Sequence, residues 1–344
     1  MPEKKKILVT GGAGYIGSHT IIELLADPTL EIISCDNFIK SSSKTFDRIK
    51  KITGKSVLNY QIDLCDPAAA EELFKKEKNI SAIIHFAALK SVPGSVADPE
   101  LYHRNNITSM NTILSCCEKF NVNYFIFSSS CAVYGNIEKL PVNEQTPLGK
   151  AQSPYAETKL INENMLKESA KKNPNTKYVS LRYFNPVGAH LSGLIGEIQF
   201  PKENLVPVIT AVAIGQLKEV VVSGNDHPTR DGTCIRDYIH VCDIAEAHVK
   251  ALNFLEKNKS DQNYFVFNLG SGKGVSVKEA IDAFEKASGQ KLNYRIGPRR
   301  AGDPHAIYSD CSLAEKELGW KPKYSIDEMM SSAWIWEKNL AAQE

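Results

Sequence analysis

Hydrophobic residues recur along the first half of the chain in short runs that alternate with longer amphipathic stretches. The short runs predict β-strands at residues 6–10, 31–36, 57–62, 81–86, 123–127 and 178–183. The stretches between them carry apolar residues at helical spacing and predict helices at residues 18–26, 67–78, 100–120 and from Ser153 onward. Strands and helices that alternate in this way form a parallel sheet covered by helices on both faces, so we expect an α/β fold.

The rhythm changes after residue 186. Residues 188–204 are rich in glycine and proline and predict a loop; a helix at 205–216, a strand at 219–222 and a polar turn at 223–234 follow. Residues 238–255 contain a helix, and the later elements are shorter. We therefore expect two domains, a sheet domain at 1–186 and a smaller mixed C-terminal lobe at 187–344, with some of the chain crossing back to the first domain.

Composition and charge are those of an ordinary soluble protein. The chain has 344 residues, 42% of them hydrophobic and 24% charged, and a net charge of +1 that gives no reason to expect nucleic acid or a membrane as partner. It has no secretory leader and no long apolar run, so we expect a cytoplasmic protein. The eight cysteines include no Cys-x-x-Cys pair, and we expect neither a metal site nor a disulfide framework.

A glycine-rich turn connects the first predicted strand to the first predicted helix. Gly11, Gly14 and Gly17 follow the strand at 6–10 with the spacing Gly-x-x-Gly-x-x-Gly. In a strand–turn–helix unit such glycines allow a tight turn, close approach of a pyrophosphate and close packing of the helix on the strand. This context predicts a Rossmann-type doubly wound parallel sheet that binds a dinucleotide.

The second predicted strand ends in an acidic residue, Asp36, which lies 19 residues after Gly17. A carboxylate at this place binds the hydroxyls of the adenosine ribose and repels a 2′-phosphate, so we expect NAD rather than NADP as cofactor. Lys40 and Lys44 follow, and their positive charges could pair with a 2′-phosphate and so allow NADP to bind. The alternative is a strand-end aspartate that only stabilises a turn.

Tyr155 and Lys159 are the strongest candidates for catalysis. Ser153 is a good N-cap and Pro154 suits the first helical position, so the two residues are expected one turn apart on the same face of a helix. A nearby ammonium group favours the phenolate and lowers the pKa of a tyrosine, which otherwise is about 10. The alternative is an amphipathic helix that carries both residues by chance.

The candidate residues at the strand ends are expected to meet. Asp36, Asp63, Phe86, Tyr183 and the run Ser128–Ser130 all follow or end predicted strands. Ligands of open parallel sheets bind beyond the carboxyl ends of the strands. The pattern therefore predicts a single crevice that contains all these side chains.

Several motifs together resemble the UDP-glucose/UDP-galactose 4-epimerases of the extended short-chain dehydrogenase/reductase superfamily. The glycine motif and Tyr-x-x-x-Lys mark the superfamily, whereas 182–190 and 231–240 are much more specific to the epimerases. The resemblance extends from Lys6 to about Trp336 and rests on the motifs at 10–19, 85–90, 127–130, 155–159, 182–190 and 236–240.

The resemblance implies a role for each matching residue. Tyr155 would exchange the proton of the sugar 4-hydroxyl, Ser130 would bridge that hydroxyl, and Lys159 would bind the nicotinamide ribose and lower the pKa of Tyr155. The implied cofactor contacts are Gly11, Gly14, Tyr15, Ile16, Gly17, Asp36, Asn37, Asp63, Leu64, Phe86, Ala87, Lys90, Asn105, Ser128, Tyr155, Lys159, Tyr183 and Phe184. The implied contacts to the UDP-sugar are Ser130, Tyr155, Asn185, Asn204, Leu205, Ser223, Arg236, Arg300, Asp303 and Ile307.

The identity of the sugar depends on Ile307. In the family this position lines the pocket beside the C2 substituent, where tyrosine excludes an N-acetyl group and a small residue admits it. Ile307 is intermediate in size and stiff about χ1, so we expect UDP-glucose and UDP-galactose to be preferred over UDP-N-acetylglucosamine. UDP-pentoses and the N-acetylhexosamines stay as alternatives, and Ile307 could instead be a core residue of the second lobe.

Two other functions fit these residues less well. A 4,6-dehydratase usually has Asp-Glu after the residue matching Ser130, whereas Cys131-Ala132 follow here. A regulatory protein that only senses the cofactor would usually lack Tyr155 or Lys159. Departures from the epimerase pattern lie at Ala132, at Pro93-Gly94 and at Ser223, and none removes a catalytic atom.

The family commonly forms homodimers through two long helices, here 100–120 and 155–171. We expect a homodimer. The apolar residues Ile107, Met110, Ile113, Leu114 and Cys117 suit such an interface, but they could equally face the sheet of their own subunit.

Overall fold

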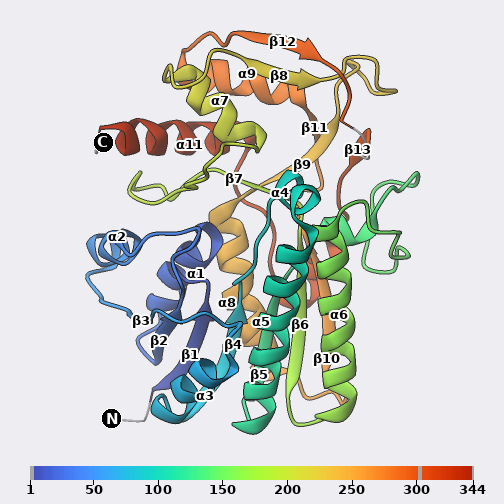
Figure 1. Cartoon of the computed structure of the whole chain (residues 1–344). Coiled ribbons are helices and arrows are strands. Elements are labelled where there is room, and N and C mark those ends of the chain that lie inside the picture. The colour runs from blue at the N-terminus through green and yellow to red at the C-terminus, as the bar shows by residue number, and fades with distance from the viewer. Residues whose placement is uncertain (1–3, 301–303, 343–344) are drawn as a thin grey trace.

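The structure, a computed structural model, describes residues 4–300 and 304–342. Its main layer is a seven-stranded sheet in the order β10-β6-β5-β4-β1-β2-β3, and every neighbouring pair is parallel. The strands are β1 (Lys5–Thr10), β2 (Leu30–Cys35), β3 (Leu58–Tyr60), β4 (Ile80–His85), β5 (Tyr124–Ser130), β6 (Lys177–Tyr183) and β10 (Tyr264–Leu269). The expected doubly wound parallel sheet is confirmed (Figure 1).

Helices cover both faces of this sheet, and each face has its own hydrophobic core. One face packs against α1 (Tyr15–Leu25), α2 (Lys44–Thr53), α8 (Val241–Lys257) and α10 (Ser312–Leu318). The other packs against α3 (Pro67–Lys76), α5 (Pro99–Lys119) and α6 (Pro154–Lys172). Strands buried on both faces are mostly apolar, which is why most of them appear in the sequence as short hydrophobic runs.

The seventh strand comes from the second half of the chain. Strand β10 pairs with β6 so that Leu269 lies opposite Tyr183, and helix α8 packs against α1 on the face of the first core. The six strands expected from the sequence therefore leave one edge incomplete until residues 241–269 return to it. A short apolar run does not reveal which sheet it joins, because its partner strand can lie anywhere in the chain.

The second lobe lies beyond the carboxyl ends of the sheet, in the upper part of Figure 1. Its strands β7 (Asn185–Val187), β9 (Ile235–His240), β11 (Gly274–Ser276) and β13 (Ala306–Ile307) form a mixed sheet, in which only β11 runs antiparallel to β9. A second, two-stranded sheet pairs β8 (Val220–Ser223) with β12 (Tyr294–Gly297). Helices α7 (Leu205–Ala213), α9 (Val277–Ser288) and α11 (Ile326–Ala341) pack around a third core.

The segment before α5 differs from the expectation. Helix α4 (Val92–Ala97) precedes α5, and it contains the departure Pro93-Gly94. The Ser91 side chain caps this helix by accepting a hydrogen bond from the Gly94 N–H at 2.9 Å, and a Cβ on Gly94 would lie 2.7 Å from the Tyr102 hydroxyl. The departure from the family pattern is therefore a capped turn in which glycine leaves room for Tyr102.

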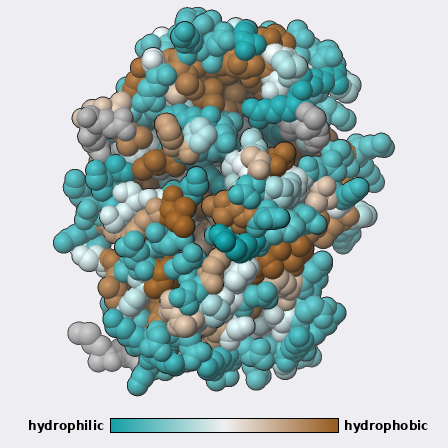
Figure 2. All heavy atoms as spheres, in the orientation of Figure 1, coloured by the Kyte–Doolittle hydropathy of each residue, from teal (hydrophilic) through white to brown (hydrophobic). Residues whose placement is uncertain are grey.

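The apolar residues of α5 that suit a dimer interface are mostly internal. Met110, Ile113, Leu114 and Cys117 are buried in the second core of this subunit, whereas Ile107 is partly exposed. Hydrophilic residues predominate on the face shown in Figure 2, with hydrophobic residues gathered in smaller areas near its middle and top. No helix within the described residues is long and apolar enough to cross a membrane.

Candidate active site

The glycine turn forms one wall of the site. Its glycines lie unusually close to neighbouring atoms. Gly11 has φ +68°, and a Cβ there would lie 2.8 Å from the Ala87 nitrogen; a Cβ on Gly17 would lie 2.3 Å from the Gly11 oxygen. Gly12, which the motif spacing does not single out, is equally constrained, since its Cβ would lie 2.3 Å from the Ser34 hydroxyl oxygen. Only glycine fits this turn.

Helix α1 begins directly at this turn, with Gly14 as an N-cap that has no side chain. The first N–H groups of the helix therefore point toward the turn without a capping side chain, as in sites that bind pyrophosphate. A small open pocket lies beside it and is lined by Gly14, Tyr15, Ser41, Arg48 and Gly196, among others. Ile16 follows within the first turn of α1.

Asp36 is buried at the end of β2 and organises the loop that follows. One carboxylate oxygen accepts hydrogen bonds from the Phe38 N–H at 2.9 Å and the Ser41 hydroxyl at 2.7 Å, and the other accepts the Ala13 N–H at 3.0 Å. Asp36 thus stabilises both its own turn and the glycine turn. The two interpretations of this aspartate, turn residue and ribose ligand, are compatible, because carboxylate oxygens accept more than one hydrogen bond each.

The remaining expected cofactor contacts on the first domain line the same edge. Asn37 follows Asp36, while Asp63 and Leu64 lie just beyond β3, where the Asp63 carboxylate accepts the Cys65 N–H at 2.9 Å. Phe86 packs on His248 with ring centroids 4.7 Å apart, and the Ala87 N–H donates to the Thr10 hydroxyl at 3.3 Å. These residues follow the carboxyl ends of strands β2, β3 and β4 of the same parallel sheet.

The catalytic candidates meet where β5 ends against the start of α6. Ser153 caps α6 by accepting the Ala156 N–H at 3.1 Å, which confirms the predicted helix start. Tyr155 is in its first turn, close enough to Ser130 for that side chain to lower the pKa of the phenol. The Lys159 Nζ atom lies 5.8 Å from the centroid of the Tyr155 ring and donates to the Ser128 carbonyl at 2.6 Å.

Burial favours the neutral forms of the Tyr155 and Lys159 side chains. It raises the pKa of Tyr155 to about 12, although the hydrogen bond to Ser130 acts in the opposite direction. It also lowers the pKa of Lys159 to about 7, against the opposing effect of the Glu163 charge. The lysine is thus placed as expected, but in the protein alone desolvation outweighs any lowering of the Tyr155 pKa.

Asn106 holds the surroundings of Tyr155 in place, and sequence reasoning missed it in favour of its neighbour Asn105. Its side chain accepts the Leu89 N–H at 2.8 Å, donates to the Leu89 carbonyl at 3.0 Å, and donates to the Thr158 hydroxyl at 3.1 Å. Asn105 in turn donates to the Asn106 side chain at 3.0 Å. A buried polar side chain in the middle of an amphipathic helix was the only available signal.

Tyr183 is fixed by a histidine from the second half of the chain. Its hydroxyl lies 2.6 Å from His248 Nε2, and His248 Nδ1 lies 2.8 Å from the Ile244 carbonyl. Burial lowers the pKa of His248 to about 4, so the ring is neutral near pH 7. Nδ1 must donate to the carbonyl, and Nε2 therefore accepts from Tyr183.

The loop at 188–204 crosses from the second lobe to the first domain. The Tyr15 hydroxyl donates to the Gly188 carbonyl at 2.6 Å, and Lys90 Nζ forms an ion pair with Glu197 at 2.6 Å. Glu197 also accepts a weaker hydrogen bond from the Asn204 side chain at 3.3 Å. Two expected cofactor residues thus contact the loop that ends at an expected substrate residue.

Asn204 and Leu205 mark the start of α7, where Asn204 is the N-cap residue. Asn185 begins β7 opposite Tyr238 of β9, directly after Phe184, which is buried. These residues lie at the junction between the two parts of the molecule.

Arg236 and Ile307 lie opposite each other on the neighbouring strands β9 and β13. Ile307 is buried in a small cluster with Val133, Tyr134 and Phe184, so it packs against both the 3₁₀ turn after Ser130 and a candidate cofactor residue. This cluster joins the second lobe to the catalytic end of the sheet. Ile307 therefore belongs to a core, but to the one that borders the site.

Asp237 anchors the strand that carries Arg236, and the sequence interpretation did not include it. Its buried carboxylate accepts hydrogen bonds from the N–H and hydroxyl of Ser271, both at 2.6 Å, and from the N–H and hydroxyl of Ser309 at 3.0 and 2.6 Å. Burial raises the pKa of Asp237, and the hydrogen bonds from Ser271 and Ser309 oppose this shift. The carboxylate thereby connects the segment after β13 to β9.

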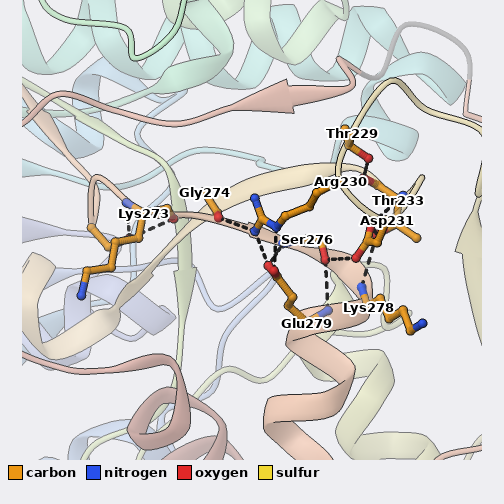
Figure 3. Close-up of polar contacts among 10 residues, drawn as sticks. Thr229, Arg230, Asp231, Thr233, Lys273, Gly274, Ser276, Lys278 and Glu279 are labelled. Atoms are coloured by element: carbon orange, nitrogen blue, oxygen red, sulfur yellow. Dashed lines mark hydrogen bonds and ion pairs between the residues drawn. The ribbon is translucent and has the colours of Figure 1, made fainter.

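The polar turn that precedes β9 is fixed to the start of α9, as Figure 3 shows. Arg230 Nε donates to Glu279 at 2.6 Å and its Nη2 donates to the Gly274 carbonyl at 2.7 Å. Ser276 and Glu279 form the capping box of α9, and the Ser276 hydroxyl also donates to Asp231. The polar turn between Ser223 and Arg236 is therefore held by side chains rather than by regular structure.

One expected substrate residue, Arg300, takes no part in the contacts described above. Arg300 is exposed beyond β12, and Asp303 lies outside the described residues. Within the part of the chain that the structure describes, no cluster of three or more His, Cys, Asp or Glu side chains could hold a metal ion. The glycine cradle, the uncapped start of α1 and the carboxylate of Asp36 are the features that a dinucleotide requires, and all three are present.

This fold and site define an extended short-chain dehydrogenase/reductase. A family profile described as GDP-mannose 4,6 dehydratase matches residues 8–333. The UDP-glucose 4-epimerase of Erwinia amylovora is 47% identical over 333 residues, which cover 96% of this chain and 97% of the relative.

Similar solved structures are also UDP-glucose 4-epimerases. The UDP-glucose 4-epimerase from Bifidobacterium longum in complex with NAD⁺ and UDP is 47% identical, with a TM-score of 0.92 over 97% of this chain and 98% of that chain. The enzyme from Stenotrophomonas maltophila with bound NAD and formylated UDP-arabinopyranose is 42% identical, with a TM-score of 0.95 over 99% of this chain and 100% of that chain. The chain belongs to the UDP-glucose 4-epimerase family, whose members are NAD-dependent isomerases.

Proposed function

We propose that the protein interconverts UDP-galactose and UDP-glucose through a transient 4-keto sugar, with NAD bound throughout. The observation that carries this proposal is the placement of Ser130, Tyr155 and buried Lys159 together at the sheet edge that also carries the glycine turn, with Lys159 Nζ 5.8 Å from the centroid of the Tyr155 ring. The glycine turn and Asp36 would hold NAD, which when bound would supply hydride transfer from C4 of the sugar and back to the opposite face of the sugar ring. Because the net redox change is zero, the cofactor need not leave between turnovers.

The chain's own residues move the proton and hold the reactants. Tyr155 takes the proton of the 4-hydroxyl and returns it, and Ser130 connects that hydroxyl to the phenol by hydrogen bonding. A protonated Lys159 favours the phenolate, which the buried Tyr155 does not reach alone at neutral pH, since its pKa is about 12. General-base catalysis by a correctly placed side chain contributes about 10²- to 10⁴-fold to the rate.

The second lobe holds the nucleotide. The guanidinium groups of Arg236 and Arg300 suit diphosphate oxygens, and Asn185, Asn204 and Leu205 lie where the two parts meet. The family resemblance implies that Asp303 contacts the UDP-sugar together with these residues. Strong contacts to UDP and few to the hexose allow the sugar to turn over between the two hydride transfers, so that C4 is inverted.

Dehydration is not favoured although the family profile carries the name of a dehydratase. The 3₁₀ turn Cys131–Tyr134 follows Ser130 directly, and the Ser130 hydroxyl accepts the Ala132 N–H at 3.2 Å. No acid and base follow Ser130 in this turn to eliminate water. The chemistry supported by the site is proton exchange at a single hydroxyl.

A direct assay tests the function. Purified protein is incubated with UDP-galactose without added NAD, and UDP-glucose is measured while NADH is followed by absorbance. We expect UDP-glucose to form with no NADH in solution. Stoichiometric NADH would instead identify a dehydrogenase, and absence of any reaction with hexose, N-acetylhexosamine and pentose nucleotides would overturn the assignment as an epimerase.

The protein acts as a cytoplasmic homodimer in galactose metabolism. Residues 1–186 are its NAD-binding part and residues 187–344 its UDP-sugar-binding part, except that residues 241–269 cross back to the sheet of the first domain. Helices α5 and α6 pack side by side, and the exposed residues Val92, Val96 and Leu101 lie at or before the start of α5. They support a dimer face at this end of the helices rather than at the buried positions. Light scattering combined with size-exclusion chromatography measures the mass; a monomer at micromolar concentration would contradict the dimer.

A further inference from the structure

A buried ion pair lies directly beneath the catalytic candidates. Glu163 follows Lys159 by one helical turn on α6, and both residues are buried. Arg182 on β6 binds the Glu163 carboxylate with two hydrogen bonds, from Nε at 2.9 Å and from Nη2 at 2.7 Å. Such a fork fixes the plane of the carboxylate.

Further contacts immobilise this pair from two sides. The Ser129 hydroxyl donates to Glu163 at 2.6 Å, and Arg182 Nη1 donates to the Tyr134 hydroxyl at 3.0 Å. Tyr134 donates in turn to the Asn268 side chain at 2.7 Å. Ser129 stands between the two serines that contact Lys159 and Tyr155, so the carboxylate is tied to the strand end that forms the site.

Lys159 itself has no ion-pair partner among the described residues, and its Nζ atom donates to the Ser128 carbonyl. The groups that face it are Tyr155 and Glu163 on its own helix, the ring of Phe127 and the carbonyl of Ser128 on β5, and buried His85 on β4. On β6 the nearest charged group is Arg182, which Glu163 neutralises. Glu163 is therefore the negative charge available to a buried ammonium group at this place.

We propose that Glu163, held by Arg182 and Ser129, is a positioning residue that keeps Lys159 protonated during the reaction. The inference rests on the proposed function, because it concerns the state of Lys159 during proton exchange. Burial favours loss of the Lys159 proton, and the Glu163 charge opposes that loss. Without this charge, the ammonium group loses its proton at a lower pH, and the phenolate of Tyr155 loses the positive charge that stabilises it.

The pH profile of kcat/KM for UDP-galactose tests the proposal in the variant Glu163→Gln. Removal of the negative charge lowers the Lys159 pKa, so the limb of the profile that reports titration of Lys159 should move down by roughly one pH unit, with bound NAD unchanged. Arg182→Lys keeps the positive charge and is the matched control, for which we expect an unmoved limb. An unmoved or upward-moved limb in Glu163→Gln would overturn the proposal.

Two further variants test whether Lys159 is the group that responds to the Glu163 charge. In the Lys159→Arg background, where the guanidinium does not titrate in this range, Glu163→Gln should no longer move the limb; a remaining shift would show that another group responds. If Glu163→Gln does not fold, the pair variant Glu163→Met with Arg182→Met removes both charges without leaving one unpaired, and the limb should still move down. Native protein without epimerase activity would overturn the function and this inference together, whereas an active native protein with an unmoved limb overturns only the inference.

Discussion

The two sides of the candidate site are built differently. At the end of the sheet, Ser130, Tyr155 and Lys159 stand on β5 and α6, above a buried pair of full charges. On the second lobe, Ser223, Arg236 and Ile307 stand on short strands whose positions depend on loops. Those loops are held by carboxylates that accept hydrogen bonds from backbone N–H groups and serine hydroxyls, and by the exposed ion pair of Arg230 with Glu279.

The difference follows from what each side must do. Proton exchange requires that two heavy atoms stay within hydrogen-bond reach, which regular elements packed on a core ensure. Nucleotide binding requires several contacts spread over a larger surface, and loops provide them with some freedom to adjust. We therefore expect changes at the sheet end to lower kcat and changes on the lobe to raise KM.

The largest expected effect is that of Tyr155→Phe at the sheet end. Loss of the phenol should lower kcat at least about a hundredfold, with KM, fold and bound NAD nearly unchanged. Steady-state kinetics and the NAD absorbance of the purified variant measure this. Tyr294→Phe, at an exposed position of β12, is the control with normal turnover. Near-normal kcat in Tyr155→Phe would mean that another group is the base.

Ile307→Gly sharpens the comparison because Ile307 packs against both sides. An extra N-acetyl group against this stiff side chain should cost about 1–3 kcal/mol, so UDP-N-acetylglucosamine should be roughly ten- to a hundredfold worse than UDP-glucose by kcat/KM. The glycine variant should narrow this difference. Ile296→Gly, exposed on β12, is the matched control. Equal use of both sugars by the native protein, unchanged in the variant, would mean that Ile307 does not line the sugar pocket.

Asp237→Asn tests the lobe by itself. The amide has the size of the carboxylate, but its NH₂ group cannot accept from the Ser271 or Ser309 donors that it would face. Loss of such hydrogen bonds costs about 1–3 kcal/mol, so KM for UDP-galactose should rise about tenfold while kcat changes little. Asp282→Asn, exposed on α9, serves as control. A fall in kcat at constant KM would break the comparison.

A separate effect is expected on stability at acid pH. His248 has its ordinary pKa near 6.5 in the unfolded chain and a pKa of about 4 in the folded protein. Burial also lowers the pKa of His240 to about 4. Between pH 6.5 and pH 4 the unfolded chain binds more protons than the folded protein. The contribution of these histidines to the free energy of unfolding is therefore fully present above pH 6.5. It decreases as the pH falls toward 4, by up to about 1.4 kcal/mol per pH unit for each histidine.

Urea unfolding between pH 4 and pH 8 measures this slope. His248→Gln keeps an acceptor for Tyr183 but cannot take up a proton, so its stability should depend less steeply on pH than that of the native protein. The same slope in both proteins would show that His248 does not contribute.

The arrangement of site residues was predictable from the sequence wherever all of them lie within one helix or one strand–turn–helix unit. The start of α6 at Ser153 and the shared face of Tyr155 and Lys159 need only the geometry of a helix, and the glycine turn needs only a strand followed by a helix. Helix boundaries were less accurate: α7 ends at Ala213 rather than 216, because the end of a helix depends on its packing and its cap.

The sequence by itself thus determined the layered α/β architecture, the cofactor turn and the reacting pair, because helical and strand periodicity relate residues that are near in the chain. Only the tertiary structure decided that β10 completes the sheet, that His248 binds Tyr183, and that Glu163 is paired with Arg182 beneath Lys159. These contacts join residues of different elements through stacked buried surfaces. Periodicity shows that a face is buried but does not show which other face covers it.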